Sequence, residues 1–364
     1  MGIDAPERGH DAAAPGVKQI ARGLFLTEPR RLEIREFELP EPAPDEAIVR
    51  VAGCGLCHTD ISFYTGAVKT RHPLPLILGH EVSGTVERAS PPFDALIGHR
   101  VIVPAVLPCG HCDLCEAGRD NACASQTMPG NHIHGGFASH LVVPVRQLVP
   151  LEFLNGHRLE DLAVIADAVT TPYQAITRAR VQSGDLVIVI GIGGIGTFAV
   201  QIARALGAQV AAVDVVDDRL ARADALGARW TFNSRTTDGK TIKATLLIAS
   251  HVSTARWRIL EMSGTAAGQE LAWSLLVPAS TLGVIGFTRD RPEIRLSNLM
   301  AFDAVAFGSW GCSPRHYPEV VQMALTNRIR LEPFVECHPL DEAPELFARL
   351  ATGEHPEKRP ILIP

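Results

Sequence analysis

The sequence predicts an α/β protein that joins a β-rich domain to a doubly wound parallel sheet. Residues 20–165 are rich in proline, glycine and short β-branched runs such as AIVRVAGCG and EVSGTVERA. Such runs, separated by turn residues at short intervals, predict a compact β domain with barrel-like closure. Near Asp167 the pattern changes to apolar strands that alternate with helices, which is typical of a parallel sheet. The 364 residues are enough for two domains of about 100–200 residues each.

The parallel part is predicted from apolar runs and helix-ending glycines that follow one another closely. LVIVIG is an uninterrupted apolar run of the kind found in buried strands, and TFAVQIARALG is a helix that ends at Gly207. Strands are predicted at 186–191, 210–214 and 281–287, and helices at 197–207 and 217–228. Short joints between strand, helix and strand imply a right-handed parallel unit.

Composition narrows the class of protein. A net charge of −6 argues against nucleic acid or an anionic membrane surface as the main partner. No apolar run reaches the ~20 residues needed to span a bilayer. Residues 1–19 lack the basic and apolar segments of a signal peptide, so we expect a flexible N-terminal extension. Eight cysteines in such a chain favour metal ligation over disulfides, and we expect a cytoplasmic location.

Four closely spaced cysteines form the most specific motif. The run PCGHCDLCEAGRDNAC contains Cys109, Cys112, Cys115 and Cys123. Thiolates so close in sequence can surround one tetrahedral zinc ion and leave no position for water, which predicts a closed structural site. Two local disulfides and a redox Cys-x-x-Cys pair are the alternatives. A redox pair does not account for four cysteines.

A glycine-rich turn predicts a dinucleotide site. GIGGIG lies between a predicted strand and a predicted helix, and supplies Gly191, Gly193, Gly194 and Gly196. Glycines there let the backbone approach a pyrophosphate, while the helix N-terminus offers free N–H groups. Asp214 ends the next strand, where a carboxylate binds the adenosine ribose and repels a 2′-phosphate, so NAD is favoured over NADP. Arg219 could flank the adenosine, although a solvated helix face explains it nearly as well.

A second metal site is indicated by a cysteine, a histidine and a later acid. Cys57 lies in GCGLCHTD, and His80 and Glu81 lie in LGHEVSG. A catalytic zinc keeps three protein ligands and an open position for water or substrate. It makes a bound alcohol easier to deprotonate, so that the alcohol carbon can release hydride to a nicotinamide.

With the four-cysteine run, GIGGIG with Asp214 and the terminal RPILIP, these motifs make residues 20–364 resemble the zinc-dependent medium-chain alcohol dehydrogenase family. The resemblance implies a GroES-like catalytic domain at 20–168 and 311–364, interrupted by a Rossmann NAD-binding domain at 169–310. It also implies two zinc ions per chain, one catalytic and one structural, and NAD as cofactor.

The resemblance also implies a role for each matching residue. Cys57 and His80 would be ligands of the catalytic zinc, and Glu81 an acid that can approach or replace a ligand. Thr59 would be the hydroxyl that takes the alcohol proton, and Asp60 the acid that orients His80. Arg359 would contact the cofactor phosphates, and Thr171 the nicotinamide.

The chain departs from the commonest family pattern at two positions. The third zinc ligand is often a cysteine, but the matching segment VIADAVTTPYQA makes Asp167 the candidate. An oxygen ligand is acceptable to zinc and leaves it a somewhat stronger Lewis acid than a second thiolate would. Five residues after Cys57, where a relay histidine is common, this chain has Ser62. The proton then leaves through Ser62, the ribose or water.

Within the family, segments 128–140, 166–175, 262–270 and 297–312 resemble 6-hydroxycyclohex-1-ene-1-carbonyl-CoA dehydrogenases of anaerobic benzoyl-CoA degradation. That resemblance implies NAD-dependent oxidation of a cyclic hydroxyacyl-CoA to the 6-oxo thioester. Coenzyme A phosphates would need positive charge, and the available groups are Arg289, Arg291, Arg295, Arg315 and His316.

Three alternative functions stay open, together with the oligomeric state. They are oxidation of another cyclic alcohol, zinc-dependent hydration of a related enone acyl-CoA by a hydratase or lyase, and binding without catalysis. The family implies a homodimer or homotetramer, with a strand near 300–311 as candidate interface.

Overall fold

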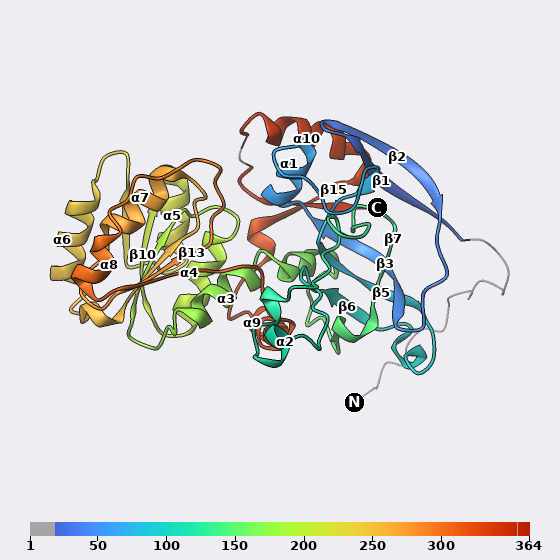
Figure 1. Cartoon of the computed structure of the whole chain (residues 1–364), viewed down its shortest axis with the longest axis horizontal. Coiled ribbons are helices and arrows are strands. Elements are labelled where there is room, and N and C mark those ends of the chain that lie inside the picture. Colours follow the sequence, from blue (N-terminus) through green and yellow to red (C-terminus); the bar gives the residue numbers. More distant parts are fainter. Residues whose placement is uncertain (1–18, 355) are drawn as a thin grey trace.

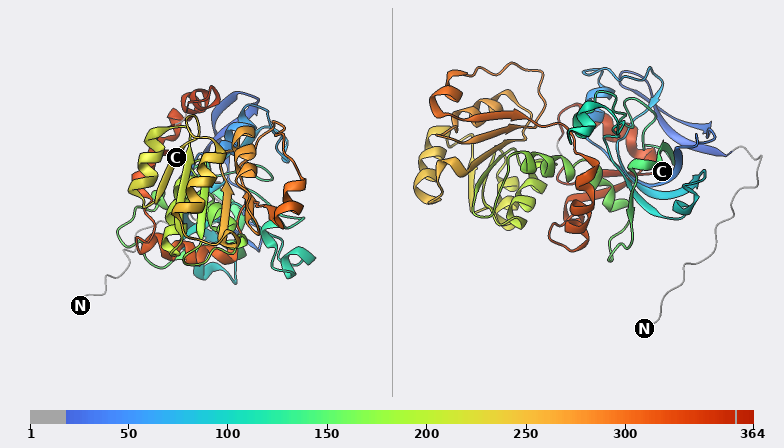
Figure 2. Two further views of the ribbon diagram at one scale, coloured as in Figure 1. Left: turned by 90° about the vertical axis from the view of Figure 1, so that its left-hand side faces the viewer. Right: turned by 60° about the horizontal axis from the view of Figure 1, so that its bottom comes forward.

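The computed structural model describes residues 19–354 and 356–364. Two lobes lie side by side, one built on a parallel sheet and one, called the antiparallel lobe, on sheets that are antiparallel except for the pair β15 and β16 (Figure 1; Figure 2, right). Most of the predicted N-terminal extension, residues 1–18, lies outside the described residues. Gln19, its last residue, donates a side-chain hydrogen bond to Glu87 at 2.6 Å.

The antiparallel lobe contains a seven-stranded sheet and a three-stranded sheet. The strand orders are β15-β16-β3-β5-β6-β8, with β7 also paired to β3, and β2-β1-β4. The strands are β1 (Ile20–Glu28), β2 (Arg31–Glu38), β3 (Glu46–Gly55), β4 (Leu76–Ile77), β5 (Glu81–Ala89), β6 (Arg100–Val103), β7 (His140–Pro144), β8 (Val149–Leu151), β15 (Val335–Pro339) and β16 (Arg359–Ile363). Its helices are α1 (His58–Tyr64), α2 (Asp113–Glu116), α9 (Tyr317–Leu325) and α10 (Ala343–Ala351).

The C-terminal strand β16 completes the larger sheet. It runs antiparallel to β3, with Ile361 opposite Gly55, and Gly55 in turn lies opposite Glu81 of β5. A Cβ on Gly55 would lie 2.2 Å from the Glu81 carboxylate, so a glycine is needed to leave that carboxylate its room. The sheet thereby brings the end of the chain beside the strands that lead to Cys57 and His80.

The parallel lobe has six strands in the order β11-β10-β9-β12-β13-β14. The strands are β9 (Leu186–Ile190), β10 (Gln209–Asp214), β11 (Trp230–Asn233), β12 (Trp257–Glu261), β13 (Thr281–Val284) and β14 (Val305–Gly308). The helices are α4 (Gly196–Ala205), α5 (Asp217–Ala225), α6 (Gly239–Ala249), α7 (Ala266–Ser274) and α8 (Ser297–Phe302). Chain order reverses at β9, and ligands of such sheets bind at the carboxyl ends of the strands beside this reversal.

The predicted α/β class and the predicted strands and helices up to residue 228 are confirmed, within a few residues at their ends. The predicted strand 281–287 is shorter, because the N–H groups of Ile285 and Gly286 donate to the carbonyl of Glu261 beyond the end of β13. The segment near 300–311 is only partly strand: α8 comes first, and β14 covers four residues.

One hydrophobic cluster runs from the parallel sheet into the other lobe. It includes Val189 of the sheet, Tyr173 of α3 (Thr170–Arg178), Tyr317 of α9 and Ile361 of β16. This shared core fixes the segment that contains Asp167 between the two lobes. Among the described residues, no helix is both long enough and apolar enough to cross a bilayer.

Candidate metal centres and cofactor site

The four cysteines of the predicted closed site lie together in a lobe around α2. The Sγ atom of Cys112 lies 3.5 Å from that of Cys115 and 3.7 Å from that of Cys123, and Cys109 Sγ lies 3.9 Å from Cys115 Sγ. Four thiolates around a tetrahedral zinc, each at about 2.3 Å, would be separated by roughly 3.8 Å. All four cysteines are free, so the disulfide alternative is not what the structure shows. The residues fit one closed tetrahedral ion.

Backbone N–H groups lower the pKa of two of these thiols, those of Cys109 and Cys112. The N–H of Cys115 is directed at the Cys112 thiol and lowers the pKa of that thiol to about 6. Burial raises the pKa of the Cys115 thiol to about 12. A bound cation would favour the thiolate form of all four.

The second cluster gathers residues from three separate segments. Cys57 caps the N-terminus of α1, His80 directly precedes β5, and Asp167 ends the 3-10 segment η4 (Glu160–Ala166). Asp167 Oδ2 lies 3.7 Å from Cys57 Sγ and 3.6 Å from His80 Nε2. Single ligand atoms of Cys57, His80, Glu81 and Asp167 all lie within 4.8 Å of one another. The sequence predicts this grouping, and the structure brings the four residues together.

His80 gives the strongest indication that a metal belongs here. The side chain is 1% exposed, and neither ring nitrogen has a hydrogen-bond partner within the described part of the chain. Burial alone would lower the pKa of His80, but the charge of Asp60 and contacts with Asp167 and Cys57 raise it well above its usual range. These surroundings favour a positive charge at this place, and a divalent cation would supply it.

Asp60 contacts the backbone of Cys57 and the ring of His80. Its carboxylate accepts the N–H of Cys57 at 2.9 Å and the N–H of Gly79 at 3.1 Å, and lies 3.4 Å from His80 Nδ1. Asp60 is fully buried. The predicted orienting acid therefore lies on the Nδ1 side of His80, while Nε2 faces Asp167.

Glu81 lies at the cluster but forms an ion pair with Arg359. The two side chains form a buried ion pair through both carboxylate oxygens, with Arg359 Nε donating to Glu81 Oε2 at 2.8 Å. Burial raises the pKa of Glu81 to about 7 against the opposing effect of Arg359. A Cβ on Gly194 would lie 2.6 Å from Arg359 Nη1, so the guanidinium also contacts the glycine-rich turn. Arg359 thus links the metal cluster to the predicted phosphate site.

The two hydroxyl residues of α1 have different neighbours. Thr59 Oγ1 lies 3.7 Å from Cys57 Sγ, and Thr59 is partly exposed. The Ser62 hydroxyl donates to the carbonyl of His58 in its own helix at 3.1 Å. Thr59 therefore lies at the cluster, whereas the relay role of Ser62 stays a prediction.

The glycine-rich turn is packed closely on one side and open on the other. Gly191 has φ +90°, and a Cβ there would lie 2.5 Å from the backbone of Ser263. A Cβ on Gly196 would lie 1.9 Å from the carbonyl oxygen of Gly191, whereas one on Gly193 would meet nothing within 4 Å. The turn is compact beneath and leaves space above Gly193.

The carboxylate of Asp214 binds the backbone of this turn. It accepts N–H groups from Ile192 at 2.6 Å and Val215 at 2.7 Å, and Arg219 Nη1 lies 3.8 Å away. Thr171 donates its hydroxyl to the Asp167 carboxylate. Thr171 therefore lies beside the third candidate ligand, and its contact with the nicotinamide stays a prediction.

Two contacts of the site are not predicted from the sequence. Ser263 packs against Gly191 from the end of a neighbouring strand, and Glu81 pairs with Arg359 across 278 residues. Strand order could have suggested the first, because β12 lies next to β9. The second depends on the sheet that places β16 beside β3.

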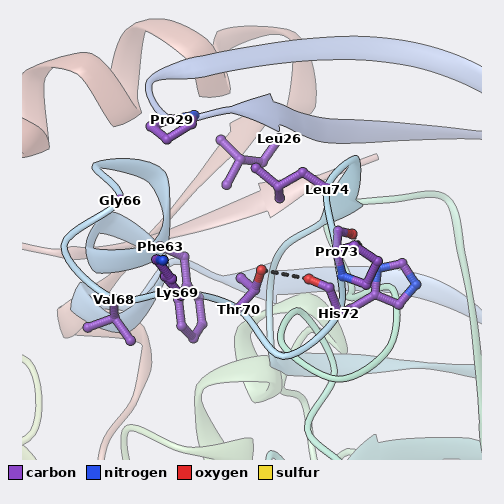
Figure 3. Close-up of a pocket in the computed structure, with 10 residues that line it drawn as sticks. All are labelled: Leu26, Pro29, Phe63, Gly66, Val68, Lys69, Thr70, His72, Pro73 and Leu74. Carbon is purple, nitrogen blue, oxygen red and sulfur yellow. Dashed lines mark hydrogen bonds between the residues drawn. The ribbon is translucent and has the colours of Figure 1, made fainter.

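A separate cavity of about 290 Å³ lies between α1 and the end of β1 (Figure 3). Its walls include apolar side chains of Leu26, Phe63 and Leu74, with Lys69 and His72 as polar members. None of its lining residues belongs to the metal cluster or the glycine-rich turn.

Two family models match this chain, one in each lobe, and the second extends into α9 of the antiparallel lobe. Residues 43–153 match the alcohol dehydrogenase GroES-like domain, and residues 194–326 match the family described as zinc-binding dehydrogenase. The chain is 30% identical over 325 residues to an alcohol dehydrogenase of Geobacillus stearothermophilus, a match that covers 89% of this chain and 94% of that relative.

Solved structures agree. Galactitol-1-phosphate dehydrogenase of Escherichia coli is 27% identical with a TM-score of 0.86, and the match covers 94% of this chain and 100% of the other. A thermostable alcohol dehydrogenase of Pyrobaculum aerophilum, solved with cobalt and zinc bound, is 25% identical with a TM-score of 0.82. That match covers 95% of this chain and all of the Pyrobaculum chain.

Proposed function

We propose a specific reaction for this chain on the premise that it belongs to the zinc-type medium-chain alcohol dehydrogenase family. Its 30% identity with an alcohol dehydrogenase over 89% of its length shows that membership. Like other members, it is an oxidoreductase that acts on CH–OH groups. The family works with zinc and a nicotinamide cofactor, so these two cofactor predictions are confirmed at the level of the family.

We assign Cys57, His80 and Asp167 as the protein ligands of the catalytic zinc. The observation that supports this assignment is the convergence of one ligand atom each from Cys57, His80 and Asp167, with His80 buried and neither of its ring nitrogens hydrogen-bonded within the described residues. When bound, zinc supplies a Lewis acid that lowers the pKa of a substrate alcohol. Glu81 is a reserve acid, because Arg359 already occupies both of its oxygens.

The chain's own residues then have separate tasks. Thr59 takes the alcohol proton, because its hydroxyl lies at the cluster and is partly exposed. Asp60 orients His80 from the Nδ1 side. The oxidation converts R₂CH–OH and NAD⁺ into R₂C=O, NADH and a proton, and Ser62, the ribose or water carries that proton away.

For the cofactor, we propose NAD, held by the glycine-rich turn, Thr171, Arg359 and Asp214. Asp214 favours NAD because its carboxylate ends β10 and would repel a 2′-phosphate. Arg219, at 3.8 Å from Asp214, is a positive group beside this carboxylate that would favour the phosphate. The ratio of kcat/KM for NAD and NADP tests the proposal, and a higher value for NADP would overturn it.

For the four-cysteine lobe, we propose a structural zinc bound by Cys109, Cys112, Cys115 and Cys123. Sulfur spacings of 3.5–3.9 Å support it. All eight cysteines of the chain are free in the structure. The cytoplasmic location stays a prediction from this cysteine content.

For the substrate, we propose a cyclic secondary alcohol carried as a coenzyme A thioester, 6-hydroxycyclohex-1-ene-1-carbonyl-CoA, oxidised to the 6-oxo thioester. The resemblance of four sequence segments supports this choice. Arg289, Arg291 and Arg295 are exposed and available for phosphates. Arg315 is less suitable, because its guanidinium lies 3.1 Å from Asp120 and donates to the carbonyl of Cys115.

A panel of alcohols tests the substrate. Cyclic alcohols are offered as coenzyme A thioesters and as free acids, together with polyols and sugar phosphates, each with NAD. We expect the thioester to have the highest kcat/KM. Equal rates on the free acids would defeat the coenzyme A proposal, and faster oxidation of a polyol would point to the chemistry of the galactitol-1-phosphate relative.

The hydratase alternative would use the same zinc as Lewis acid, and the production of NADH distinguishes it from the dehydrogenase. Oxidation forms one NADH for each ketone, whereas hydration of an enone forms none. We expect stoichiometric NADH, measured by its absorbance, when the alcohol is added. Product formation without NADH would favour the hydratase.

As a partner, we propose a second copy of the chain across the edge strand β14. This strand pairs only with β13 in the described sheet. Apolar side chains of the strand and of the segment just before it are exposed: Leu296, Met300 and Val305 are 69%, 79% and 58% exposed. Light scattering should report a dimer or tetramer, and Val305→Lys should shift it toward the monomer. An unchanged mass for this variant would exclude the β14 edge.

A further inference from the structure

Tyr317 is a buried tyrosine at the start of α9 whose hydroxyl contacts the segment of a candidate metal ligand. Its side chain is fully buried. The hydroxyl donates to the carbonyl of Ala166 and accepts the N–H of Ala105 at 3.3 Å. Ala166 directly precedes Asp167 in the chain.

The Ala166 carbonyl is a junction of several donors. The Thr170 hydroxyl donates to it at 3.2 Å, and the N–H of Ala105 lies 3.4 Å from it. In the next peptide unit, Thr171 donates its N–H to the Asp167 carbonyl at 2.8 Å, and its hydroxyl donates to the Asp167 carboxylate. The backbone around Asp167 is therefore held on both sides.

The donors come from different parts of the fold. Ala105 follows β6, Thr170 begins α3, and Tyr317 begins α9, just after the chain returns from β14 of the parallel lobe. Ala105 and Thr170 precede the strands of the parallel sheet in the sequence, whereas Tyr317 follows them. Its hydroxyl ties the Asp167 segment to that returning chain.

We propose that Tyr317 is a positioning residue that holds Asp167 in place as third metal ligand, by fixing the Ala166 carbonyl. The proposal rests on the assignment of Asp167 under the proposed function. Hydrogen-bonded partners behind a metal ligand typically change metal affinity or activity by about 10–100-fold when they are removed. The Tyr317 hydroxyl acts through the backbone, so we expect an effect near the lower end of that range.

Cobalt binding tests the proposal without reference to turnover. The holoprotein is prepared with zinc retained in the four-cysteine lobe and cobalt titrated into the second site, for the wild type, Tyr317→Phe and Asp167→Ala. We expect Tyr317→Phe to bind cobalt about 10-fold more weakly and to shift the visible absorption bands of the bound ion. In kinetics, kcat should fall while KM for NAD stays within about twofold, since the glycine-rich turn is untouched.

A matched control separates this role from ordinary loss of a buried hydroxyl. Tyr64 is also a buried tyrosine of the antiparallel lobe, and its ring packs on Phe347 of α10. Tyr64→Phe should leave cobalt affinity and spectrum unchanged. If Tyr317→Phe does not fold, Thr170→Val removes another donor from the same carbonyl and should weaken cobalt binding in the same direction.

The outcomes are distinct. Weaker cobalt binding in Asp167→Ala with wild-type binding and spectrum in Tyr317→Phe, or in Thr170→Val where that variant replaces it, would overturn the positioning role alone. Wild-type cobalt binding in Asp167→Ala would overturn the ligand assignment itself.

Discussion

The two candidate metal sites differ in how far apart their residues lie in the sequence. The four-cysteine lobe takes all its proposed ligands from fifteen consecutive residues around one short helix. The cluster at Cys57, His80 and Asp167 takes its proposed ligands from three segments up to 110 residues apart. The lobe therefore needs little more than local folding, while the second cluster exists only once both sheets and η4 are in place.

The two sites also differ in chemistry. The lobe offers four equal thiols, and its ion would have no free position. The second cluster offers sulfur, nitrogen and oxygen, with a hydroxyl beside it and an acid behind it. A closed site suits stability and a mixed, partly exposed site suits reaction, and variants of each should separate these two properties.

The largest effect is expected from Cys57→Ser. Loss of one of three ligands should leave the catalytic site without zinc, and so without its Lewis acid, and lower kcat/KM for the alcohol by about 10³-fold. The melting temperature should change far less than in variants of the lobe. Steady-state kinetics and calorimetry measure both, and a variant with wild-type turnover would remove Cys57 from the reaction.

Cys112→Ser should show the opposite pattern. Structural zinc sites contribute folding free energy directly, so the melting temperature should fall by at least about 6 °C. The kcat of the remaining folded enzyme, per catalytic metal, should stay within about threefold of wild type, since the two clusters share no residue. Stability unchanged with the lobe metal lost would show that the lobe does not support the fold.

Glu81→Gln should destabilise the reactive side of the molecule. It removes one partner of a buried ion pair and leaves Arg359 without its counter-charge, which typically costs about 3 kcal/mol in the free energy of unfolding. Glu87→Gln on the same strand is the control, because its half-buried pair with Arg50 should contribute less than about 1 kcal/mol. Equal losses in urea unfolding would contradict the difference in burial.

The smallest effect is expected from Arg315→Met. This guanidinium joins the lobe to the segment before α9, but its side chain is 62% exposed. Its removal should lower the free energy of unfolding by at most about 1 kcal/mol and leave kcat unchanged. A large loss of activity would mean that the lobe communicates with the second cluster through this contact.

Sequence patterns predict the local features well and the distant ones poorly. The apolar run before GIGGIG and the glycines after each helix place β9, α4 and β10 correctly, because those signals are local. Residues 229–259 give no clear pattern, since α6 has Leu247 and Ile248 exposed and so lacks an apolar face confined to the core. The pairing of Glu81 with Arg359 and of Tyr317 with Ala166 depends on sheet order and on the shared core, which no local pattern encodes.

Metal stoichiometry tests the division between the two sites most directly. The account predicts two zinc ions per chain in the wild type and one each in Cys57→Ser and Cys112→Ser. It further predicts that the Cys57→Ser protein is stable and inactive, and that the Cys112→Ser protein is active and less stable. One zinc in the wild type, or turnover that follows the lobe metal rather than the second one, would contradict it.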